Sequence, residues 1–274
     1  AIEGVDNTLI YTVKQDNISN EATTVTVKVT TGTDLEAADI VSITYTNATG
    51  SVIVISDPAA IASLLNGSSE LTLKVPAGST AAPVITVTTV DDAIYENSEQ
   101  LNVMIDSANN ADVDSTVATG RIADESSNTL DPGDQSNTDG DRPTVSVTGN
   151  SATEGAAIDF NVTLSNPSEI ATTVSLTLAD GSAELGVDTD TPVQVSLDSG
   201  STFSDVTVGS DGSFEVIVPA NHNTGIIVRV PTVNDPIDEA DETFTLSAIV
   251  AGQTTASSAT GSIIDNDNAP VITI

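Results

Sequence analysis

The stretch Val84-Ile-Thr-Val-Thr88 runs directly into Thr89-Val-Asp-Asp-Ala-Ile-Tyr-Glu-Asn-Ser-Glu99, so alternating apolar and polar residues are followed at once by a series of acids. Alternation with period two in β-branched residues is typical of a strand that buries one face. Similar runs recur along the chain, at 25–29, 71–75, 145–147, 174–178, 193–195 and 244–246. Turn residues separate them at short intervals, which predicts antiparallel β-sandwiches of immunoglobulin-like type.

One short helix is expected within this all-β fold, at 58–65. Asp57 can cap its first turn, Pro58 occupies the first helical position, and Gly67 follows its end. Lys, Arg, Met and Gln, which favour helices, are scarce in the rest of the chain. The helix is therefore predicted to decorate the first half of a β protein.

The two halves of the chain repeat each other. Thr232-Val-Asn-Asp-Pro-Ile-Asp-Glu-Ala-Asp-Glu242 matches 89–99 at an offset of 143 positions. Shorter matches flank this one: Val75-Pro-Ala with Val218-Pro-Ala, Ala118-Thr-Gly-Arg-Ile122 with Ala259-Thr-Gly-Ser-Ile263, and Ala22-Thr-Thr-Val25 with Ala171-Thr-Thr-Val174. We predict two homologous modules.

The junction between the modules reads DESSNTLDPGDQSNTDGD from Asp124 to Asp141, a polar stretch without periodicity that predicts a linker. The last ten residues, 265–274, resemble 139–147, where the second module begins. We expect a first module at 1–125 with an incomplete first strand, an acidic linker at 126–142, a second module at 143–268, and the start of a following module at 269–274.

Composition excludes several classes of function. Forty acidic residues against six basic ones give a net charge of −34, which repels nucleic acids and anionic membrane surfaces. No apolar run approaches the length of a membrane span, so no membrane insertion is expected. The chain has no Cys and one His, which removes thiol nucleophiles, Cys-ligated zinc and multi-His metal sites. We expect a monomer that is not an enzyme.

The acids recur in the same order in both modules, always at strand ends or in loops. Each module has a Glu-Gly near its start, an Asp after an early loop, an Asp-x3-Glu-x2-Glu array and a closing acid. In the first module these are Glu3, Asp39, Asp92, Glu96, Glu99 and Asp124; in the second they are Glu154, Asp188, Asp235, Glu239, Glu242, Asp265 and Asp267. A sandwich brings alternate loops together at one pole, so the acids of each module are expected to converge.

Converging carboxylates require a cation. Two of them about 4 Å apart repel by roughly 4 kcal/mol at an effective dielectric constant near 20. Ca²⁺ accepts six to eight hard oxygen ligands in flexible geometry, whereas Mg²⁺ prefers a tighter octahedron, and transition metals favour the His and Cys ligands that this chain lacks. Calcium is the predicted ion.

The sequence resembles the Calx-β family. The resemblance is carried by Gly181-Ser-Ala-Glu-Leu-Gly-Val-Asp188, Val218-Pro-Ala220, Asp235-Pro-Ile-Asp-Glu-Ala-Asp-Glu-Thr-Phe244 and Ala259-Thr-Gly-Ser-Ile-Ile-Asp-Asn-Asp267. It covers nearly all of the second module and the first from Val75 to Asp124. It implies a seven-stranded immunoglobulin-like sandwich that holds calcium at one end, through the acids named above for each module. The first module departs from the motif, because nothing acidic corresponds to Asp241.

The composition of the chain, which is rich in Thr, Ser, Val and Asp, also resembles that of the repeat regions of giant bacterial repeats-in-toxin adhesins, which are exported by type I secretion. That resemblance implies an extracellular or cell-surface module that serves as a calcium-stiffened extender in adhesion or biofilm formation. Its partners would be the neighbouring modules of the same chain. The alternative is a unit that binds a cell-surface sugar or protein through the insertions at 56–66 and 198–208.

Other features have simpler interpretations. Asp198-Ser-Gly200 has half the pattern of an aspartic-protease dyad, yet it is common turn chemistry and no partner motif accompanies it. His222 is expected in an exposed turn. Glycoside hydrolysis by paired carboxylates is disfavoured because the chain has no Trp and 3% aromatic residues with which to stack a sugar.

The linker acids Asp139 and Asp141 lie close in sequence to Asp124 and to the turn at Glu154. They either form a flexible acidic spacer or add calcium ligands at the junction. If calcium bridges the junction, the two modules should hold a fixed, extended pose; without the ion, the like charges should leave them hinged.

Overall fold

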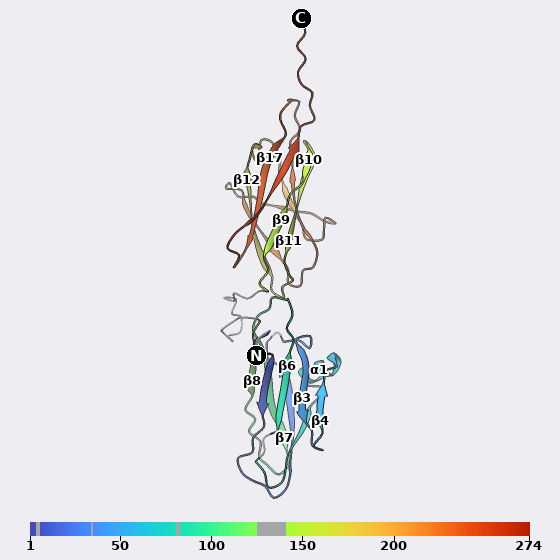
Figure 1. The fold of residues 1–274 in the computed structure, drawn as a ribbon, viewed down its shortest axis with the longest axis vertical. Helices are drawn as coiled ribbons and strands as arrows, with labels where there is room; N and C mark the ends of the chain where they lie inside the picture. The colour runs from blue at the N-terminus through green and yellow to red at the C-terminus, as the bar shows by residue number, and fades with distance from the viewer. Residues whose placement is uncertain (4–5, 34, 81–82, 125–140) are drawn as a thin grey trace. The chain divides into compact units, whose positions relative to one another are not determined.

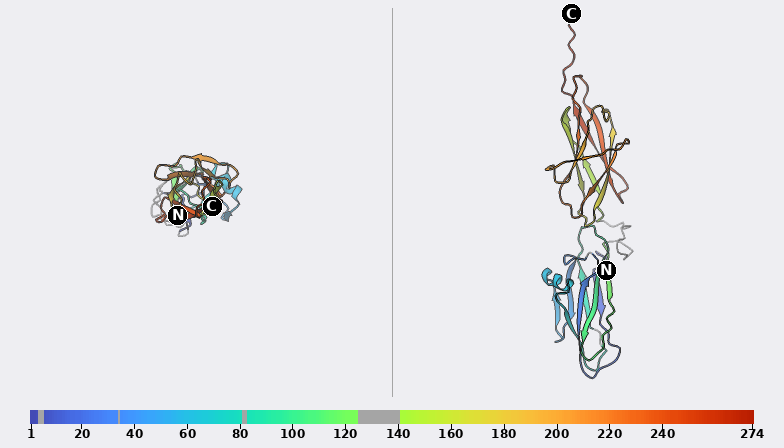
Figure 2. Two further views of the ribbon diagram at one scale, coloured as in Figure 1. Left: turned by 90° about the horizontal axis from the view of Figure 1, so that it is seen from above. Right: turned by 180° about the vertical axis from the view of Figure 1, so that it is seen from behind.

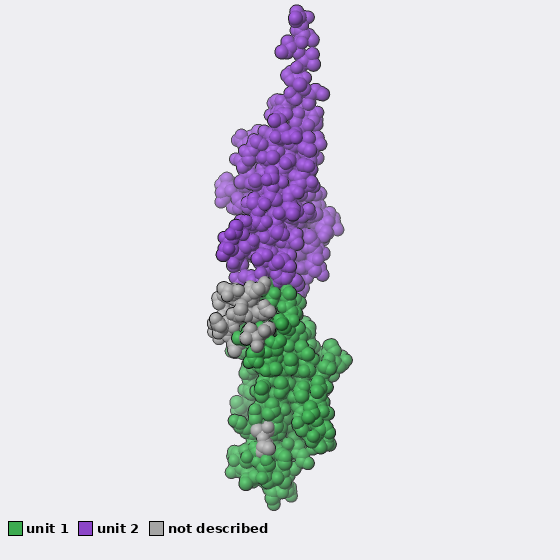
Figure 3. Space-filling view, viewed as in Figure 1, with its two compact units in different colours: residues 1–141 green, residues 142–274 purple. Residues whose placement is uncertain are grey.

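The computed structural model describes residues 1–3, 6–33, 35–80, 83–124 and 141–274. The chain folds as two compact units, unit 1 at 1–141 and unit 2 at 142–274 (Figure 3). The expected linker falls outside the described residues except at its last two positions, 141 and 142. No helix in the described ranges has the length and apolar character that crossing a bilayer requires.

Unit 1 is a sandwich of two four-stranded sheets (Figure 1). One sheet has the order β1-β6-β3-β4 and the other β5-β2-β7-β8, and all neighbouring strands are antiparallel. The strands are β1 (Thr8–Thr12), β2 (Thr23–Thr31), β3 (Ile40–Thr46), β4 (Val52–Ile55), β5 (Leu71–Val75), β6 (Val84–Thr89), β7 (Glu99–Ala108) and β8 (Ala118–Ile122).

Unit 2 is a sandwich of two five-stranded sheets, with the orders β10-β18-β17-β12-β15 and β14-β13-β16-β11-β9 (Figure 2). All of its strand pairs are antiparallel except β10 with β18, which is parallel. The strands are β9 (Val145–Thr148), β10 (Ser151–Thr153), β11 (Ala157–Leu164), β12 (Thr172–Asp180), β13 (Val193–Ser196), β14 (Ser204–Val206), β15 (Ser213–Val218), β16 (Ile226–Pro231), β17 (Glu242–Val250) and β18 (Ser257–Ile264).

The strands of the two units correspond in chain order and in pairing, but their beginnings differ. In unit 2 the first strand divides: β9 pairs with β11 in one sheet, and β10 pairs with β18 in the other. In the described part of unit 1, a parallel bridge from Ile2 to Ala123 takes the place of β10, and no strand takes the place of β9.

Each unit has its own hydrophobic core between its sheets. Alternating residues of β2 and β7 are buried in unit 1, as are those of β12 and β17 in unit 2. Phe160 and Phe244 meet edge to face in the core of unit 2, with ring centroids 5.6 Å apart. These mainly antiparallel all-β sandwiches confirm the predicted fold class, although the described residues form eight strands in unit 1 and ten in unit 2 where the resemblance implies seven.

The predicted helix is also confirmed: α1 spans Pro58–Leu65. The Asp57 carboxylate accepts a hydrogen bond of 2.9 Å from the backbone N–H of Ala60, which caps the helix. Three apolar side chains of α1 are buried in the core of unit 1, namely Ile61, Leu64 and Leu65. The helix is thus part of the core of unit 1. The other insertion, at 198–208, contributes the edge strand β14.

Candidate metal centre

The strand directions of unit 2 bring distant acids to one pole. β10, β12, β16 and β18 end at this pole, and β17 begins there. Glu154 follows β10, Asp188 lies between β12 and β13, and Glu242 opens β17. Asp235 and Glu239 occupy the loop before β17, while Asp265 and Asp267 follow β18. Acids spread over more than a hundred positions of the sequence therefore surround one small region.

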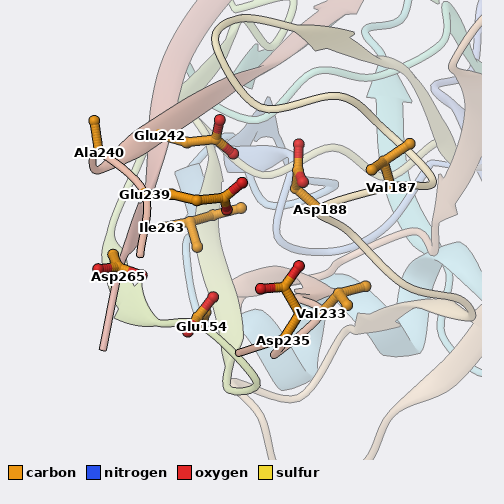
Figure 4. A pocket seen from close by; sticks show the side chains of 10 residues that line it. All are labelled: Glu154, Val187, Asp188, Val233, Asp235, Glu239, Ala240, Glu242, Ile263 and Asp265. Carbon is orange, nitrogen blue, oxygen red and sulfur yellow. The ribbon is translucent and has the colours of Figure 1, made fainter. Parts of the chain in front are cut away.

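Two overlapping sets of carboxylates form the candidate centre. Glu154, Asp235 and Glu239 each place an oxygen within 4.8 Å of the others, and Glu154, Asp265 and Asp267 do the same. Glu154 belongs to both sets. Figure 4 shows six of the acids around a hollow whose volume of 20 Å³ has room for about one water-sized body.

Backbone contacts hold the loops of this pole in place. The N–H of Val233 donates to the carbonyl of Asp188 (2.9 Å), and Thr232 binds the carbonyl of Ala156 through its N–H (3.2 Å) and its hydroxyl (2.6 Å). Gly155 has φ +78, and a Cβ there would lie 2.8 Å from the Cβ of Asn234. Because only glycine accepts both constraints, the loop that carries Asp235 can approach the turn that carries Glu154.

The electrostatics of this pole favour a cation. Burial raises the pKa of Glu242, and the charges of Asp188 and Glu239 raise it further. Partial loss of solvation also raises the pKa of Glu239, with the charge of Asp235 as the next cause. For Glu154, burial is again the first cause of a raised pKa, followed by a hydrogen bond with Asp267. Each shift means that the ionised carboxylates lack compensating positive charge.

Several carboxylate oxygens at this pole have no hydrogen-bond partner. These buried atoms are Glu154 Oε1, Asp265 Oδ1 and Asp267 Oδ2. In the described part of the chain, ion pairs join Lys28 to acids of unit 1 and Arg229 to Asp159, and none reaches the acids of this pole. Buried carboxylates are normally hydrogen-bonded, paired or metal-bound, so these oxygens fit a cation.

The corresponding acids of unit 1 are more deeply buried than those of unit 2. Glu3, Asp39, Glu96, Glu99 and Asp124 are all buried, with exposures of 2–7%. Asp39, Glu96 and Glu99 each place an oxygen within 4.8 Å of the others.

Backbone hydrogen bonds position two of these acids, one of them as in unit 2. The N–H of Val90 donates to the carbonyl of Asp39 (2.8 Å), the counterpart of the bond from Val233 to Asp188. The Glu96 N–H donates to the Asp124 carboxylate (3.0 Å).

The pKa of Glu3 is strongly raised. Burial, followed by the charges of Asp124, Asp92, Asp39 and Asp91, raises its pKa to about 8. Burial also raises the pKa of Asp39. Asp92 itself is exposed and binds the N–H of Ile94 (2.8 Å), so it acts on the buried set through its charge.

Among the described residues, six predicted ligands lie outside these three sets: Glu3, Asp92, Asp124, Asp141, Asp188 and Glu242. Asp188 and Glu242 nevertheless line the hollow of unit 2. Asp139 lies outside the described residues, and Asp141 is half-buried but joins none of the carboxylate groups found among the described residues. Three contributors were not predicted. Asp241 accepts a bond of 3.3 Å from the Asp265 N–H, Asn234 packs against Gly155, and Asp91 raises the pKa of Glu3. Their proximity to the acidic runs was the only signal in the sequence.

The two catalytic alternatives correspond to turn structures. Asp198 accepts hydrogen bonds from the Thr202 hydroxyl (2.7 Å), the Thr202 N–H (2.8 Å) and the Ser196 hydroxyl (2.7 Å). These hydrogen bonds, of which those from Thr202 have the largest effect, lower the pKa of Asp198 to about 2. The Asp198 carboxylate thus closes a turn. The His222 ring lies 3.3 Å from the hydroxyl of Thr224 in the same turn.

No family model matches the chain, and no curated protein matches it. Among solved structures, it is similar to the apo-form Calx CBD1 domain, at 14% identity over 45% of this chain and 99% of that one, with a TM-score of 0.31. It is similar to the calcium binding domain CBD12 of CALX1.1, at 10% identity over 90% and 75%, with a TM-score of 0.32. The collagen adhesin of S. aureus gives 9% identity over 96% and 89%, with a TM-score of 0.29. At these scores the functional inference depends on the carboxylates themselves.

Proposed function

We propose that the chain is a calcium-binding tandem of β-sandwich modules. The observation that carries this proposal is the pair of carboxylate sets that share Glu154, with buried oxygens that lack a protein partner. Asp235 and Glu239 would hold an ion on one side of Glu154, and Asp265 and Asp267 on the other. In unit 1, Asp39, Glu96 and Glu99 would do the same.

The choice of ion follows from the donor atoms. Every ligand in these sets is a carboxylate oxygen, and His222 lies in a different turn of unit 2. Hard oxygen donors suit Ca²⁺, and the spread of the acids over several loops suits its flexible coordination better than the strict octahedron of Mg²⁺. When bound, the ion supplies the positive charge that the pole otherwise lacks.

We place the module in a large secreted or surface-anchored bacterial adhesin, where it acts as an extender between other modules. Support comes from the resemblance of the sequence to repeats-in-toxin adhesins, and from the carboxylate sets at the pole where β18, the last strand of unit 2, ends. Loops at that pole tighten when an ion joins them, so binding would stiffen the exit of the chain. Calcium at the linker acids Asp139 and Asp141 would extend this stiffening to the junction, which scattering with and without calcium would measure.

The binding of a sugar or protein ligand through the insertions remains the second hypothesis. The buried side chains of α1 support a structural role for the first insertion. In the second, Phe203 lies under the guanidinium of Arg229, 3.8 Å from ring centroid to Cζ, and this arginine pairs with Asp159. A glycan-array screen of the chain separates the two hypotheses.

Calcium titration by calorimetry tests the main proposal. We expect saturable binding that Glu154→Gln weakens strongly and Asp211→Asn leaves intact, because Asp211 closes a turn with Ser213 outside both sets. A titration that shows only the heat of dilution would refute the proposed site. Equal weakening of calcium binding by the two substitutions would refute it as well.

A further inference from the structure

The strand β4 is an unprotected edge of unit 1. It is the last strand of its sheet, and β3 is its only strand partner among the described residues (Figure 1). Its residues, Val52-Ile-Val-Ile55, are all apolar, and the side chains of Val52 and Val54 are 67% and 60% exposed. Edge strands usually carry a charge or a proline that prevents pairing with a strand of another molecule. β4 has neither.

The backbone of β4 presents hydrogen-bonding groups at this edge. The N–H of Asn47 donates to the carbonyl of Ser51 (2.9 Å), where the chain turns from β3 into β4. Because backbone groups alternate along a strand, those of Ile53 then face β3, and those of Val52 and Val54 face outward. The same two residues therefore present both outward backbone groups and exposed apolar side chains.

The corresponding edge of unit 2 is protected. β14 is the last strand of its sheet, has three residues, and carries the exposed Asp205 in its middle. The Asp205 carboxylate accepts a hydrogen bond from the side chain of Gln194 (2.8 Å). Gln194 is paired in turn with Arg229, which forms an ion pair with Asp159. A polar row thus crosses the sheet of unit 2 and ends at its edge.

The charge distribution of the chain favours contact at the sheet that contains β4. A net charge of −34 makes two copies of the chain repel each other. The sheet β1-β6-β3-β4 is an exception, because its four strands contain no charged residue. Beside the exposed valines of β4 lie Thr44 and Thr46 of β3. A second copy of the chain can therefore approach this sheet without placing acid against acid.

We propose that β4 pairs with β4 of a second copy of this chain, antiparallel and about a two-fold axis at Ile53. Val52 of each copy then faces Val54 of the other, and each of these pairs exchanges two backbone hydrogen bonds. Asp57 lies opposite Thr49 of the other copy, so the two Asp57 carboxylates remain apart. The pairing joins two four-stranded sheets into one continuous sheet.

The strand suits a second copy because it is complementary to itself. One register satisfies both outward residues of both copies and brings four exposed valines together on one face. The contact joins the same surface of each copy, so it closes at a dimer. This dimer would take the place of the monomer that the sequence predicts, and it is independent of the carboxylate sets.

Sedimentation equilibrium of the whole chain, with calcium present, tests the proposal. We expect the mass to rise with concentration from one chain to two and no further. Association should tighten as salt is added, because salt screens the repulsion between the acidic chains while the contact itself is uncharged. A mass of one chain at every concentration would overturn the proposal. Growth past a dimer, or weakening by salt, would overturn it as well.

A matched pair of lysine variants tests which edge is used. Val54→Lys should raise the dissociation constant of the dimer at least about tenfold, since each dimer loses two buried valines. Ile10→Lys is the control, because Ile10 is 66% exposed and belongs to β1, the opposite edge of the same sheet. Equal weakening by the two substitutions would overturn the assignment to β4.

A proline variant tests the backbone pairing. The N–H of Val54 faces away from β3, so Val54→Pro should cost the edge strand little and abolish the dimer. Val54→Ile keeps both the N–H and the apolar side chain, and it should associate like the unchanged protein. A Val54→Pro chain that still dimerises would contradict strand pairing.

Cysteine crosslinking tests the register, because the chain has no cysteine of its own. At the axis the two Ile53 residues form a pair without hydrogen bonds, whose Cα atoms lie about 4.5 Å apart. Ile53→Cys should therefore form a disulfide between two copies under mild oxidant, seen on a non-reducing gel. Val52→Cys is the matched control, since its two copies lie diagonally, about 7–8 Å apart, and should stay unlinked. Crosslinking of Val52→Cys in place of Ile53→Cys would overturn the proposed register.

Discussion

The acidic poles of the two units use the same residue order to build different environments. In unit 1, five acids are buried, with exposures of 2–7%. In unit 2, Glu154 is buried and Glu239 is exposed. The other acids of unit 2 are half-buried, namely Asp188, Asp235, Glu242, Asp265 and Asp267. A buried carboxylate can stay in the fold either protonated or bound to a cation, while an exposed one can be solvated. Unit 1 should therefore depend on its ion more strongly than unit 2.

Removal of calcium should have the largest effect, and it should be greater in unit 1. An ion at a hundredfold excess over its dissociation constant stabilises the folded state by about 2.7 kcal/mol per site. Hydrogen exchange measured unit by unit, with calcium and with chelator, should show faster exchange throughout both units on chelation, most of all in unit 1. Equal changes in exchange in the two units, or no change in either, would contradict the stronger dependence of unit 1 on its ion.

Neutralising the shared carboxylate should come next. Glu154→Gln removes a ligand from both sets of unit 2 and should weaken calcium binding at least about tenfold, since a unit charge some 4 Å from the ion is worth more than 1.4 kcal/mol at an effective dielectric constant near 20. Glu239→Gln and Asp235→Asn each affect one set and should do less. Calorimetric titration of the variants gives the order, and Asp211→Asn serves as the control.

The raised pKa of Glu3 should make the stability of unit 1 depend on pH. The pKa of Glu3 is raised to about 8 from 4.5, so the folded state holds a proton that the unfolded state has released. Without calcium, unit 1 should lose stability as the pH rises from about 4.5 to 8. The stabilising contribution of protonated Glu3 is fully present below this pH range. Calcium should oppose the loss and release protons on binding.

This release can be measured by calorimetry in buffers of different ionisation enthalpy. Glu3→Gln in the calcium-free protein is the control, because it should flatten the dependence. A stability that rises over this pH range would contradict the assignment.

The smallest effect should come from the helix cap, which unit 2 does not have. Asp57→Ala should cost about 1 kcal/mol by freeing the Ala60 N–H, and calcium binding should be unchanged. Thermal unfolding followed by circular dichroism measures the loss. A change in ligand or calcium binding without loss of stability would instead give this insertion a functional role.

The sequence was sufficient for seven of the strands, namely β2, β5, β6, β9, β12, β13 and β17, for α1 and for the order of the acids. These depend on local alternation, on a cap and a proline, and on repetition. The sequence did not distinguish the buried Glu99 from the half-buried Glu242, since each opens the corresponding strand of its unit. Only the structure explains why a glycine follows Glu154. Gly155 is required by Asn234, 79 positions away in the chain.

The parallel pair β10–β18 has a mechanical consequence for unit 2. The chain enters β10 from the side of β9 and leaves β18 at the pole where both strands end, so tension along the chain pulls these parallel neighbours in opposite directions. Their contacts, at Ser151–Ser262, Ala152–Ile263 and Thr153–Ile264, are then loaded together in shear instead of opening one by one. An ion held by Glu154 and Asp265 would join the same two strands just beyond the last of these contacts. Calcium would then set the force at which the module gives way.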